Sequence, residues 1–333
     1  MADADVATRS PESDARENTQ ETATPGETPA HTSPTMGEHC TSDRPTPTGL
    51  APKGEVRKLG GVDVYLAKPE SYPTNPSKLL LLLSSGTGIK STNNQIQADK
   101  FADEGFVVVM PDLFDGNPAP NSSPVSEDEA QGTSFLDKLK FKAVEIAKSF
   151  VIDEWLARHT EEKVMPILEK VIDACKGEFA DAVGNGGGIY AVGYCFGGRY
   201  VLLLASERSQ AQTGWSGAQK PADEEAGEGA GPSKKGPYIK AGALAHATLV
   251  SPEDFQGLKV PVSLVCVESD PMFPDEVRET GEKIMSTENV EHEVQVYPGV
   301  PHGFAVIGDY DDAHIKDAQI TAFEQMLRWL KEH

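Results

Sequence analysis

Apolar runs and amphipathic stretches alternate along most of the chain. Continuous apolar runs such as 78–83 predict strands that are buried on both faces of a parallel sheet. Strands are predicted at 56–59, 62–66, 78–83, 105–110, 188–193 and 241–246, and within 262–271 and 292–304. Helices are predicted at 94–104, 155–172, 200–205, 274–285 and 311–331. This alternation indicates a doubly wound α/β fold, with a mostly parallel sheet, helices on both faces and an antiparallel edge made by the first two strands.

The motif Gly193-Tyr194-Cys195-Phe196-Gly197 lies between a predicted strand and a predicted helix. This context is typical of a nucleophile elbow, with Cys195 as the nucleophile. The nucleophile of an elbow has a strained backbone, and side chains two residues before and after it would collide with the turn. The start of the following helix also favours a thiolate. A tight turn in which the cysteine only packs is the alternative interpretation of this motif taken alone.

An elbow nucleophile requires an acid and then a histidine, each after a later strand. Asp270 ends one such strand, and His302 lies in a Pro- and Gly-rich loop after the next. We assign Cys195 as nucleophile, His302 as base and then acid, and Asp270 as the carboxylate that orients the imidazole. Glu268 is the alternative acid, but Asp270 stands at the strand end, where the chain turns at Pro271.

Three further histidines compete with His302 for the role of base: His246, His292 and His314. His292 opens a strand and His314 lies on an exposed helical stretch, so both are expected to face solvent. His246 ends a strand at the catalytic edge. It either has a structural role or borders the pocket as a second base.

Several motifs resemble the dienelactone hydrolase family of the α/β-hydrolase fold. They are Gly-Tyr-Cys-Phe-Gly-Gly at 193–198, Glu-Ser-Asp-Pro-Met-Phe-Pro at 268–274 and Pro-Gly-Val-Pro-His-Gly-Phe at 298–304. Residues 110–116 resemble the family's loop after its fourth strand, and 39–49 resemble the lead-in of its fungal members. The resemblance spans about residues 37–333. It implies hydrolysis of a small ester or lactone through an acyl-enzyme.

A glycine-rich loop, 84–88, follows the apolar strand 78–83. It lacks the Gly-Lys-Ser/Thr ending of a phosphate loop, so nucleotide binding is not predicted. In an α/β-hydrolase this loop supplies one oxyanion N–H group, which we assign to Gly86, and the residue after the nucleophile, Phe196, supplies the other. The remaining candidate substrate-binding residues are Ser85, Tyr194 and Ile307.

Two positions depart from the family pattern. Bacterial members carry a glutamate that contacts the cysteine, and Ser84 and Ser85 stand at the matching positions here. A hydroxyl cannot take the thiol proton, so activation depends on His302 and the helix dipole. Members often carry a carboxylate-binding arginine after the histidine, where this chain has Ile307. A less polar ester or lactone is therefore favoured over dienelactone itself. Two arginines are candidates to replace the missing one, although exposed helix positions are the simpler interpretation: Arg158 and Arg199.

The chain of 333 residues has 52 acidic and 30 basic residues and a net charge of −22. Nucleic acids and anionic membranes require clustered Lys and Arg, so neither is an expected partner. The resemblance implies a small-molecule ester or lactone as the partner. No metal or organic cofactor is implied. Four cysteines without a CxxC motif, no signal peptide and no membrane-length apolar run favour a cytoplasmic setting. Both monomer and homodimer stay open.

Composition also predicts how the chain is divided. Residues 1–36 are rich in Thr, Pro and Glu and predict a disordered tail, and 37–333 are expected to form one domain. The stretch 115–160 is a candidate lid insertion near the pocket. The stretch 208–238, rich in Gly, Ala and Glu, is a candidate flexible insertion.

Two other classes of function remain open. One is a non-hydrolytic isomerase or cyclase that uses the same pocket, a reading motivated by the altered loop at Ser84 and Ser85. Complete inertness towards generic esters would favour it. The other is a non-enzymatic binding protein on this fold, which a Cys195 without enhanced thiol reactivity would support.

Overall fold

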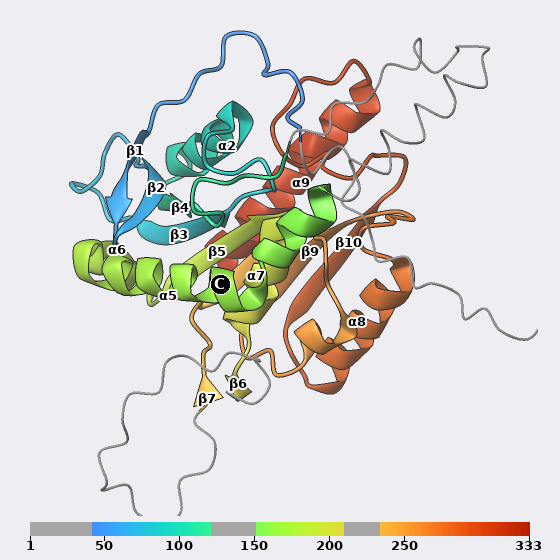
Figure 1. The fold of residues 1–333 in the computed structure, drawn as a ribbon. Helices are drawn as coiled ribbons and strands as arrows, with labels where there is room; N and C mark the ends of the chain where they lie inside the picture. The colour runs from blue at the N-terminus through green and yellow to red at the C-terminus, as the bar shows by residue number, and fades with distance from the viewer. Residues whose placement is uncertain (1–41, 121–150, 210–233) are drawn as a thin grey trace, which may run out of the picture. The chain divides into compact units, whose positions relative to one another are not determined.

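The computed structural model describes residues 42–120, 151–209 and 234–333, all within the compact unit Pro34–His333. In this part of the chain, eight strands form one sheet in the order β1-β2-β4-β3-β5-β8-β9-β10 (Figure 1). The strands are β1 Glu55–Leu59, β2 Val62–Ala67, β3 Lys78–Leu83, β4 Phe106–Pro111, β5 Ile189–Tyr194, β8 Ala241–Ala245, β9 Val262–Val267 and β10 His292–Tyr297. Strand β2 pairs antiparallel with β1 and β4, and the pairs from β4 to β10 are parallel. The predicted mostly parallel sheet with an antiparallel edge is confirmed.

Helices cover both faces of this sheet. They are α2 Thr92–Asp103, α5 Glu161–Glu178, α6 Ala180–Gly186, α7 Phe196–Ala205, α8 Asp275–Thr287 and α9 Ala313–Glu332. In Figure 1, α5 and α7 cross the near face and α9 lies behind the sheet. Strand β3 alternates between two cores: Leu79, Leu81 and Leu83 pack with residues of α5 and α7, whereas Leu80 and Leu82 pack with residues of α2 and α9. A strand buried on both faces explains the continuous apolar run.

The single long helix predicted over 155–172 is wrong, because the chain breaks between two helices there. Residues 151–158 are helical, and α5 begins after Thr160, whose backbone is extended. The side chain of His159 turns back, with Nδ1 2.7 Å from the carbonyl oxygen of Trp155, and so satisfies one of the last carbonyls of the first helix. Acidic residues then open α5, where the helix dipole favours them.

Several smaller elements and boundaries complete the description. The short helix α6 and the 3₁₀ turn Pro252–Phe255 were not expected, and a two-residue ladder of β6 Arg208–Ser209 and β7 Lys234–Lys235 closes the base of the 208–238 stretch. The predicted tail 1–36, residues 121–150 of the candidate lid and residues 210–233 of the candidate insertion lie outside the described residues. The division into domains therefore stays a prediction.

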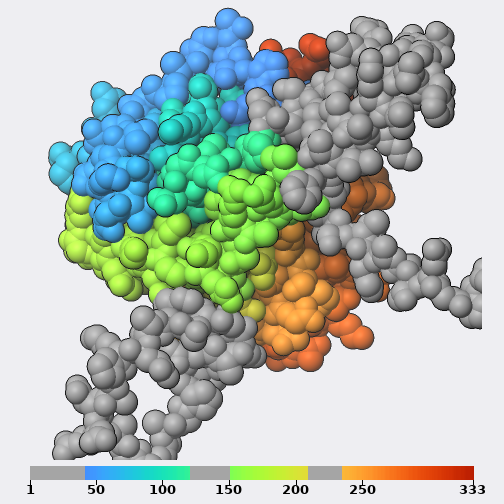
Figure 2. Space-filling model, viewed as in Figure 1, coloured from blue at the N-terminus to red at the C-terminus, as the bar shows by residue number. Residues whose placement is uncertain are grey.

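The lead-in, residues 42–54, lies along α2, as the blue and teal surfaces in Figure 2 show. Asn93 of α2 donates to the carbonyl of Arg44 at 2.7 Å and accepts from Thr46 at 2.8 Å. Further along, the N–H of Lys53 donates to Asp99 at 2.7 Å. The described lead-in residues thereby pack against the folded unit.

None of the helices in the described ranges combines the length and the apolar composition needed to cross a membrane.

Candidate active site

Cys195 is the turn between β5 and α7 and is fully buried. Its backbone has φ +50° and ψ −114°, a conformation that side-chain-bearing residues rarely adopt. Hydrogen bonds hold this geometry: the N–H of Cys195 donates to Ala245 at 3.1 Å, and its carbonyl accepts from Gly198 at 3.0 Å and Thr248 at 3.1 Å. A strained backbone that is fixed on several sides is expected where a nucleophile must project from a tight turn.

The two glycines that flank the turn have no room for a side chain. A Cβ atom on Gly193 would lie 2.4 Å from the carbonyl oxygen of Gly197, and a Cβ on Gly197 would lie 2.1 Å from that of Leu83. Both distances are far below van der Waals contact. The expectation that side chains at these positions would collide with the turn agrees with this geometry.

Asp270 and His302 meet at the same edge of the sheet. Nδ1–H of His302 donates to Oδ2 of Asp270 at 2.7 Å, and Oδ1 of that carboxylate accepts from the N–H of Met272 at 2.9 Å. Asp270 is 2% exposed, whereas Glu268 is exposed. Asp270, and not Glu268, is therefore the carboxylate that holds the imidazole.

The thiol of Cys195 interacts with the other side of the same imidazole. Burial lowers the pKa of His302, but the hydrogen bond with Asp270 and the interaction with the Cys195 side chain outweigh it and raise the pKa to about 9. Nε2 of His302 is buried and makes no well-formed hydrogen bond, so the contact with the thiol is loose, as is common in unliganded active sites. An imidazole with this pKa is protonated at pH 7, and a positive neighbour favours the thiolate form of a cysteine.

Two backbone N–H groups have no backbone acceptor among the described residues: that of Phe196, which directly follows the nucleophile, and that of Gly86 in the 84–88 loop. In the first turn of α7, the N–H of Gly197 donates to Ser84 at 3.1 Å, which ties the 84–88 loop to the nucleophile turn. The carbonyl of Gly86 accepts from Ala119 at 2.8 Å. The first N–H groups of a helix have no partner inside the helix and point outward, so such donors suit a developing oxyanion.

The side chain of Ser85 belongs to a small hydroxyl and amide network. Its Oγ lies 2.9 Å from Oγ1 of Thr87, and Nδ2 of Asn94 donates to Ser85 at 3.3 Å, to Thr87 at 3.0 Å and to the carbonyl of Gly88 at 2.9 Å. This network stiffens the loop that carries Gly86. The hydroxyl of Ser84 is buried and has no hydrogen-bond partner among the described atoms.

Tyr194 and Ile307 are both buried and lie on either side of Gln97. Nε2 of Gln97 donates to the hydroxyl of Tyr194 at 2.9 Å, and the N–H of Ile307 donates to Oε1 of Gln97 at 3.1 Å. The side chain of Ile307 lines a small cavity with Ser85 and His246. Tyr194 is fully buried behind the nucleophile, a position that suits support of the turn.

Thr248 was missed by sequence reasoning. Its Oγ1 lies 3.9 Å from Sγ of Cys195, within the range of a hydrogen bond to sulfur, and the residue is 1% exposed. The only signal in the sequence is its place three residues after the end of β8. A hydroxyl at this distance can donate to a thiolate.

Of the competing histidines, only His246 reaches this site. Its ring lies edge-to-face with that of His302, with centroids 5.0 Å apart, and it borders the small cavity as one prediction allowed. Nδ1 of His292 lies 2.7 Å from the carbonyl of Val290, and Nε2 of His314 lies 2.9 Å from that of Pro298. These two rings serve local structure.

Neither candidate arginine is placed to replace an anion clamp. Arg199 donates to both carboxylate oxygens of Asp254, at 2.9 and 3.0 Å, and to Glu161 at 3.3 Å. Arg158 is exposed and pairs with Glu154. The guanidinium of Arg199 is thereby committed to an internal ion-pair network.

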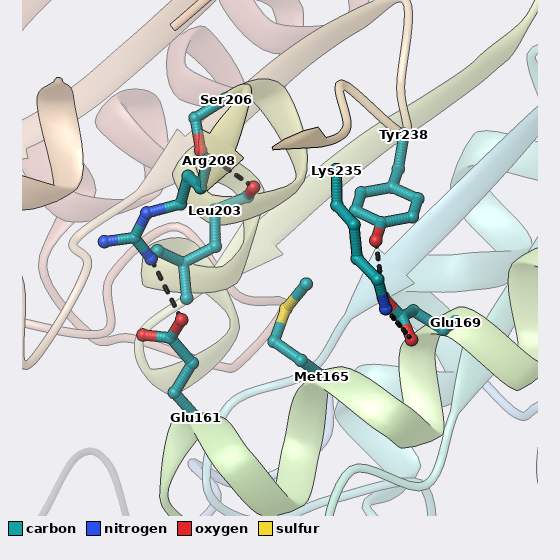
Figure 3. Close-up of a pocket in the computed structure, with 8 residues that line it drawn as sticks. All are labelled: Glu161, Met165, Glu169, Leu203, Ser206, Arg208, Lys235 and Tyr238. Atoms are coloured by element: carbon teal, nitrogen blue, oxygen red, sulfur yellow. Dashed lines mark hydrogen bonds and ion pairs between the residues drawn. The ribbon is translucent and has the colours of Figure 1, made fainter. Parts of the chain in front are cut away.

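A second cavity lies between α5 and the base of the 208–238 stretch (Figure 3). Arg208 donates to Glu161 at 3.0 Å on one side, and Lys235 donates to Glu169 at 3.2 Å on the other. Its lining includes none of the three predicted catalytic residues. The described ranges also contain no group of three or more His, Cys, Asp or Glu side chains arranged for a metal ion.

Comparison with known proteins places this chain in a family. The profile of the dienelactone hydrolase family matches residues 62–333. The chain belongs to the dienelactone hydrolase family. Hydrolase tropI from Talaromyces stipitatus is 28% identical over 85% of this chain and 91% of its own length. Hydrolase pyvD from Aspergillus violaceofuscus is 27% identical over 84% of this chain and 91% of its own length.

Solved structures agree on the fold. The thermophilic esterase Est2 from Thermogutta terrifontis aligns over 83% of this chain and 92% of its own, with a TM-score of 0.53 and 17% identity. The dienelactone hydrolase family member described here thus has the α/β-hydrolase fold that the resemblance of its motifs implied. Family membership makes it a hydrolase of the ester-cleaving kind, with a small-molecule substrate.

Proposed function

We propose that this protein hydrolyses a small ester or lactone through a covalent thioester on Cys195. The observation that carries the proposal is the contact of one buried imidazole, His302, with the carboxylate of Asp270 on one side and the thiol of Cys195 on the other. Nucleophile, base and orienting acid stand in the order and roles of a hydrolase triad.

Acylation starts from the thiolate of Cys195 and the protonated imidazole of His302 in the enzyme without substrate. The Cys195 thiolate attacks the substrate carbonyl, and the N–H groups of Phe196 and Gly86 stabilise the oxyanion that forms. When the carbonyl reforms, the C–O bond to the leaving group breaks and protonated His302 gives its proton to the departing alkoxide. The products are an alcohol, or the free hydroxyl end of an opened lactone, and an acyl-thioester.

Deacylation reverses the proton flow. Neutral His302 takes a proton from water, and the resulting hydroxide attacks the thioester carbonyl. Collapse of the second oxyanion expels the Cys195 thiolate and leaves the carboxylic acid. Asp270 stays ionised throughout and stabilises the imidazolium that forms in this step.

A substrate of low polarity is favoured by the walls of the site. The ring of Phe196 packs against Phe114 and Trp155, with centroids 5.1 and 5.4 Å apart, so a buried aromatic cluster lies next to the nucleophile turn. Ile307 lines the small cavity beside His246, whose other lining residues include the polar side chains of Asp43 and Arg44. We propose an apolar or aromatic acyl or alkoxy group on the substrate, without a carboxylate that requires an arginine.

The proposal also covers the cellular compartment and the oligomeric state of the protein. Three buried cysteines, Cys175, Cys195 and Cys266, form no disulfide in the described part of the chain, which supports a reducing compartment such as the cytoplasm. Assembly as a monomer or a homodimer is equally compatible with the proposed chemistry.

Turnover of a panel of aryl esters and small lactones tests the proposal. We expect Cys195→Ala and His302→Ala each to lower kcat by roughly 10³-fold or more, because removing one member of a catalytic unit costs nearly as much activity as removing all of them. Cys175→Ala is the matched control: this buried thiol on α5, whose pKa burial raises to about 12, should be dispensable for activity. Activity that survives Cys195→Ala would contradict the mechanism.

A further inference from the structure

The loop that carries His302 must reach back across the sheet. Cys195 follows β5 and His302 follows β10, and β8 and β9 lie between these two strands in the sheet. The hydrogen bond to Asp270 fixes one side of the imidazole, but it does not fix the distance between the ring and the β5 turn. Another contact must set that distance.

Gln97 of α2 makes such a contact. It is 1% exposed and uses both ends of its side-chain amide: Nε2 donates to the hydroxyl of Tyr194, and Oε1 accepts from the N–H of Ile307. A backbone N–H can only donate, so Oε1 must face Ile307 and the orientation of the amide is determined. Tyr194 immediately precedes the nucleophile, and Ile307 lies five residues after His302.

This amide links the two halves of the site through one rigid, planar group. Both hydrogen bonds are buried, so each unmade bond would leave a polar group without water. The rest of the loop is held separately: Nε2 of Gln319 on α9 donates to the carbonyls of Phe304 and Val306 at 2.9 and 2.7 Å. Loss of Gln97 should therefore shift the loop without unfolding it.

We propose that Gln97 is a positioning residue that sets the separation between the His302 imidazole and the Cys195 thiol. This inference rests on the proposed function for its catalytic consequence. It does not rest on the identity of the substrate. A displacement of about 1 Å between reacting groups costs up to about 100-fold in rate, so a single amide at this place has a measurable effect.

The test compares three substitutions with a matched control on the same helix. Gln97→Leu removes both hydrogen bonds, and Tyr194→Phe removes one with less disturbance. Gln97→Glu keeps an acceptor for the N–H of Ile307 and accepts from the hydroxyl of Tyr194, to which the wild-type amide donates. Gln95→Leu is the control, because the half-buried Gln95 donates only to the carbonyl of Ile89, at 2.8 Å.

Three readouts are measured on each folded variant: the pKa of His302 by NMR, the rate of Cys195 alkylation by iodoacetamide, and kcat and KM for an aryl ester. The titratable groups that face His302 in the described chain are Asp270, Cys195 and His246, and no variant alters these three. Gln97→Glu adds a carboxylate, so the pKa of His302 is compared only among the other variants. We expect Gln97→Leu to lower the pKa of His302 and to slow alkylation and kcat by roughly 10- to 100-fold, with KM within about threefold.

Tyr194→Phe should give a smaller change of the same sign and little further change in the Gln97→Leu background. Gln97→Glu should recover at least part of the loss, and Gln95→Leu should behave as wild type. A folded Gln97→Leu or Tyr194→Phe variant with the wild-type His302 pKa and alkylation rate would overturn the inference. If the wild type instead hydrolyses no ester while Gln97→Leu shifts the His302 pKa, the proposed function fails and the positioning role stands.

Discussion

At the scale of single residues, the turn at Cys195 requires neighbouring residues without side chains. The nucleophile has a positive φ, and the neighbouring chain approaches so closely that Gly193 and Gly197 cannot carry a side chain. The turn is stable because hydrogen bonds from three directions fix it, so the strain is a local cost offset by the surrounding fold.

Gly197→Ala should therefore disrupt the turn. Its Cβ would meet the Leu83 carbonyl at 2.1 Å, and we expect a loss of roughly 2–4 kcal/mol in the free energy of unfolding together with lost activity. Gly184→Ala in α6 is the control, because nothing lies within 4 Å of the added Cβ. It should be neutral or stabilise by up to about 1 kcal/mol. Urea denaturation of both variants measures the difference, and an equally stable Gly197→Ala would contradict the close approach.

His302 should make stability depend on pH above neutrality. Its folded-state pKa of about 9 is raised from 6.5, so its contribution is fully present below pH 6.5 and is lost as pH rises through about 9. The loss is up to about 3 kcal/mol. The difference in free energy of unfolding between wild type and His302→Gln, measured by urea denaturation across this range, isolates the group. A difference that grows with pH would show that the pKa is not raised.

Thr248→Val should weaken the thiolate without changing the shape of the site. The substitution removes the hydroxyl 3.9 Å from Sγ of Cys195 and keeps the backbone bond from residue 248 to the Cys195 carbonyl. One hydrogen bond corresponds to about a 3- to 10-fold slower alkylation by iodoacetamide near pH 7. Thr248→Ser, which keeps the hydroxyl, should react at nearly the wild-type rate; equal rates for the serine and valine variants would exclude a role for the hydroxyl.

Residues at strand ends could be assigned from sequence, whereas residues that act through long-range contacts could not. Cys195, Asp270 and His302 each follow a predicted strand, and parallel strands end at one edge of a sheet. Gln97 and Thr248 stand in no motif. Their roles depend on which strand lies beside which helix, and that arrangement is not contained in a local pattern.

Helix α2 organises the site at the scale of elements. Its buried face carries polar side chains, each with its own target: Asn93 binds the lead-in, Asn94 the 84–88 loop, and Asp99 binds Lys53 and the hydroxyl of Tyr65. The sequence predicted a helix here, but a run of polar residues is normally read as a solvent-facing surface. The break before α5 was missed for the same reason, because the polar residue that interrupts the helical spacing there, His159, is buried.

Asn94→Leu should loosen the loop that carries Gly86. The wild-type amide donates to the Gly88 carbonyl and to Thr87, and these bonds stiffen the segment that supplies one proposed oxyanion donor. We expect kcat to fall by roughly 10- to 100-fold with little change in KM, because the donor matters most in the transition state. Steady-state kinetics alongside Gln95→Leu, the adjacent position, checks this. An unchanged kcat would show that the hydrogen bonds of Asn94 do not contribute to oxyanion stabilisation.

The order of strands brings the site together at the scale of the whole molecule. Strands β5, β9 and β10 are parallel members of one sheet, and their following loops supply the three predicted catalytic residues. The fold was predictable because the apolar runs, the alternating helices and the motif spacing all indicated the same architecture. Net charge could exclude classes of partner, but it carries no information about which ester or lactone the pocket accepts.

The most direct test of the central claim is a search for a covalent intermediate. The wild-type protein is exposed briefly to an activated aryl acetate, quenched in acid, and analysed by mass spectrometry of its peptides. We predict one acetyl group on the peptide that contains Cys195, lost on longer incubation in the wild type and absent from Cys195→Ala. Acetylation of a different residue during turnover, or turnover with no dependence on Cys195, would contradict nucleophilic catalysis by this cysteine.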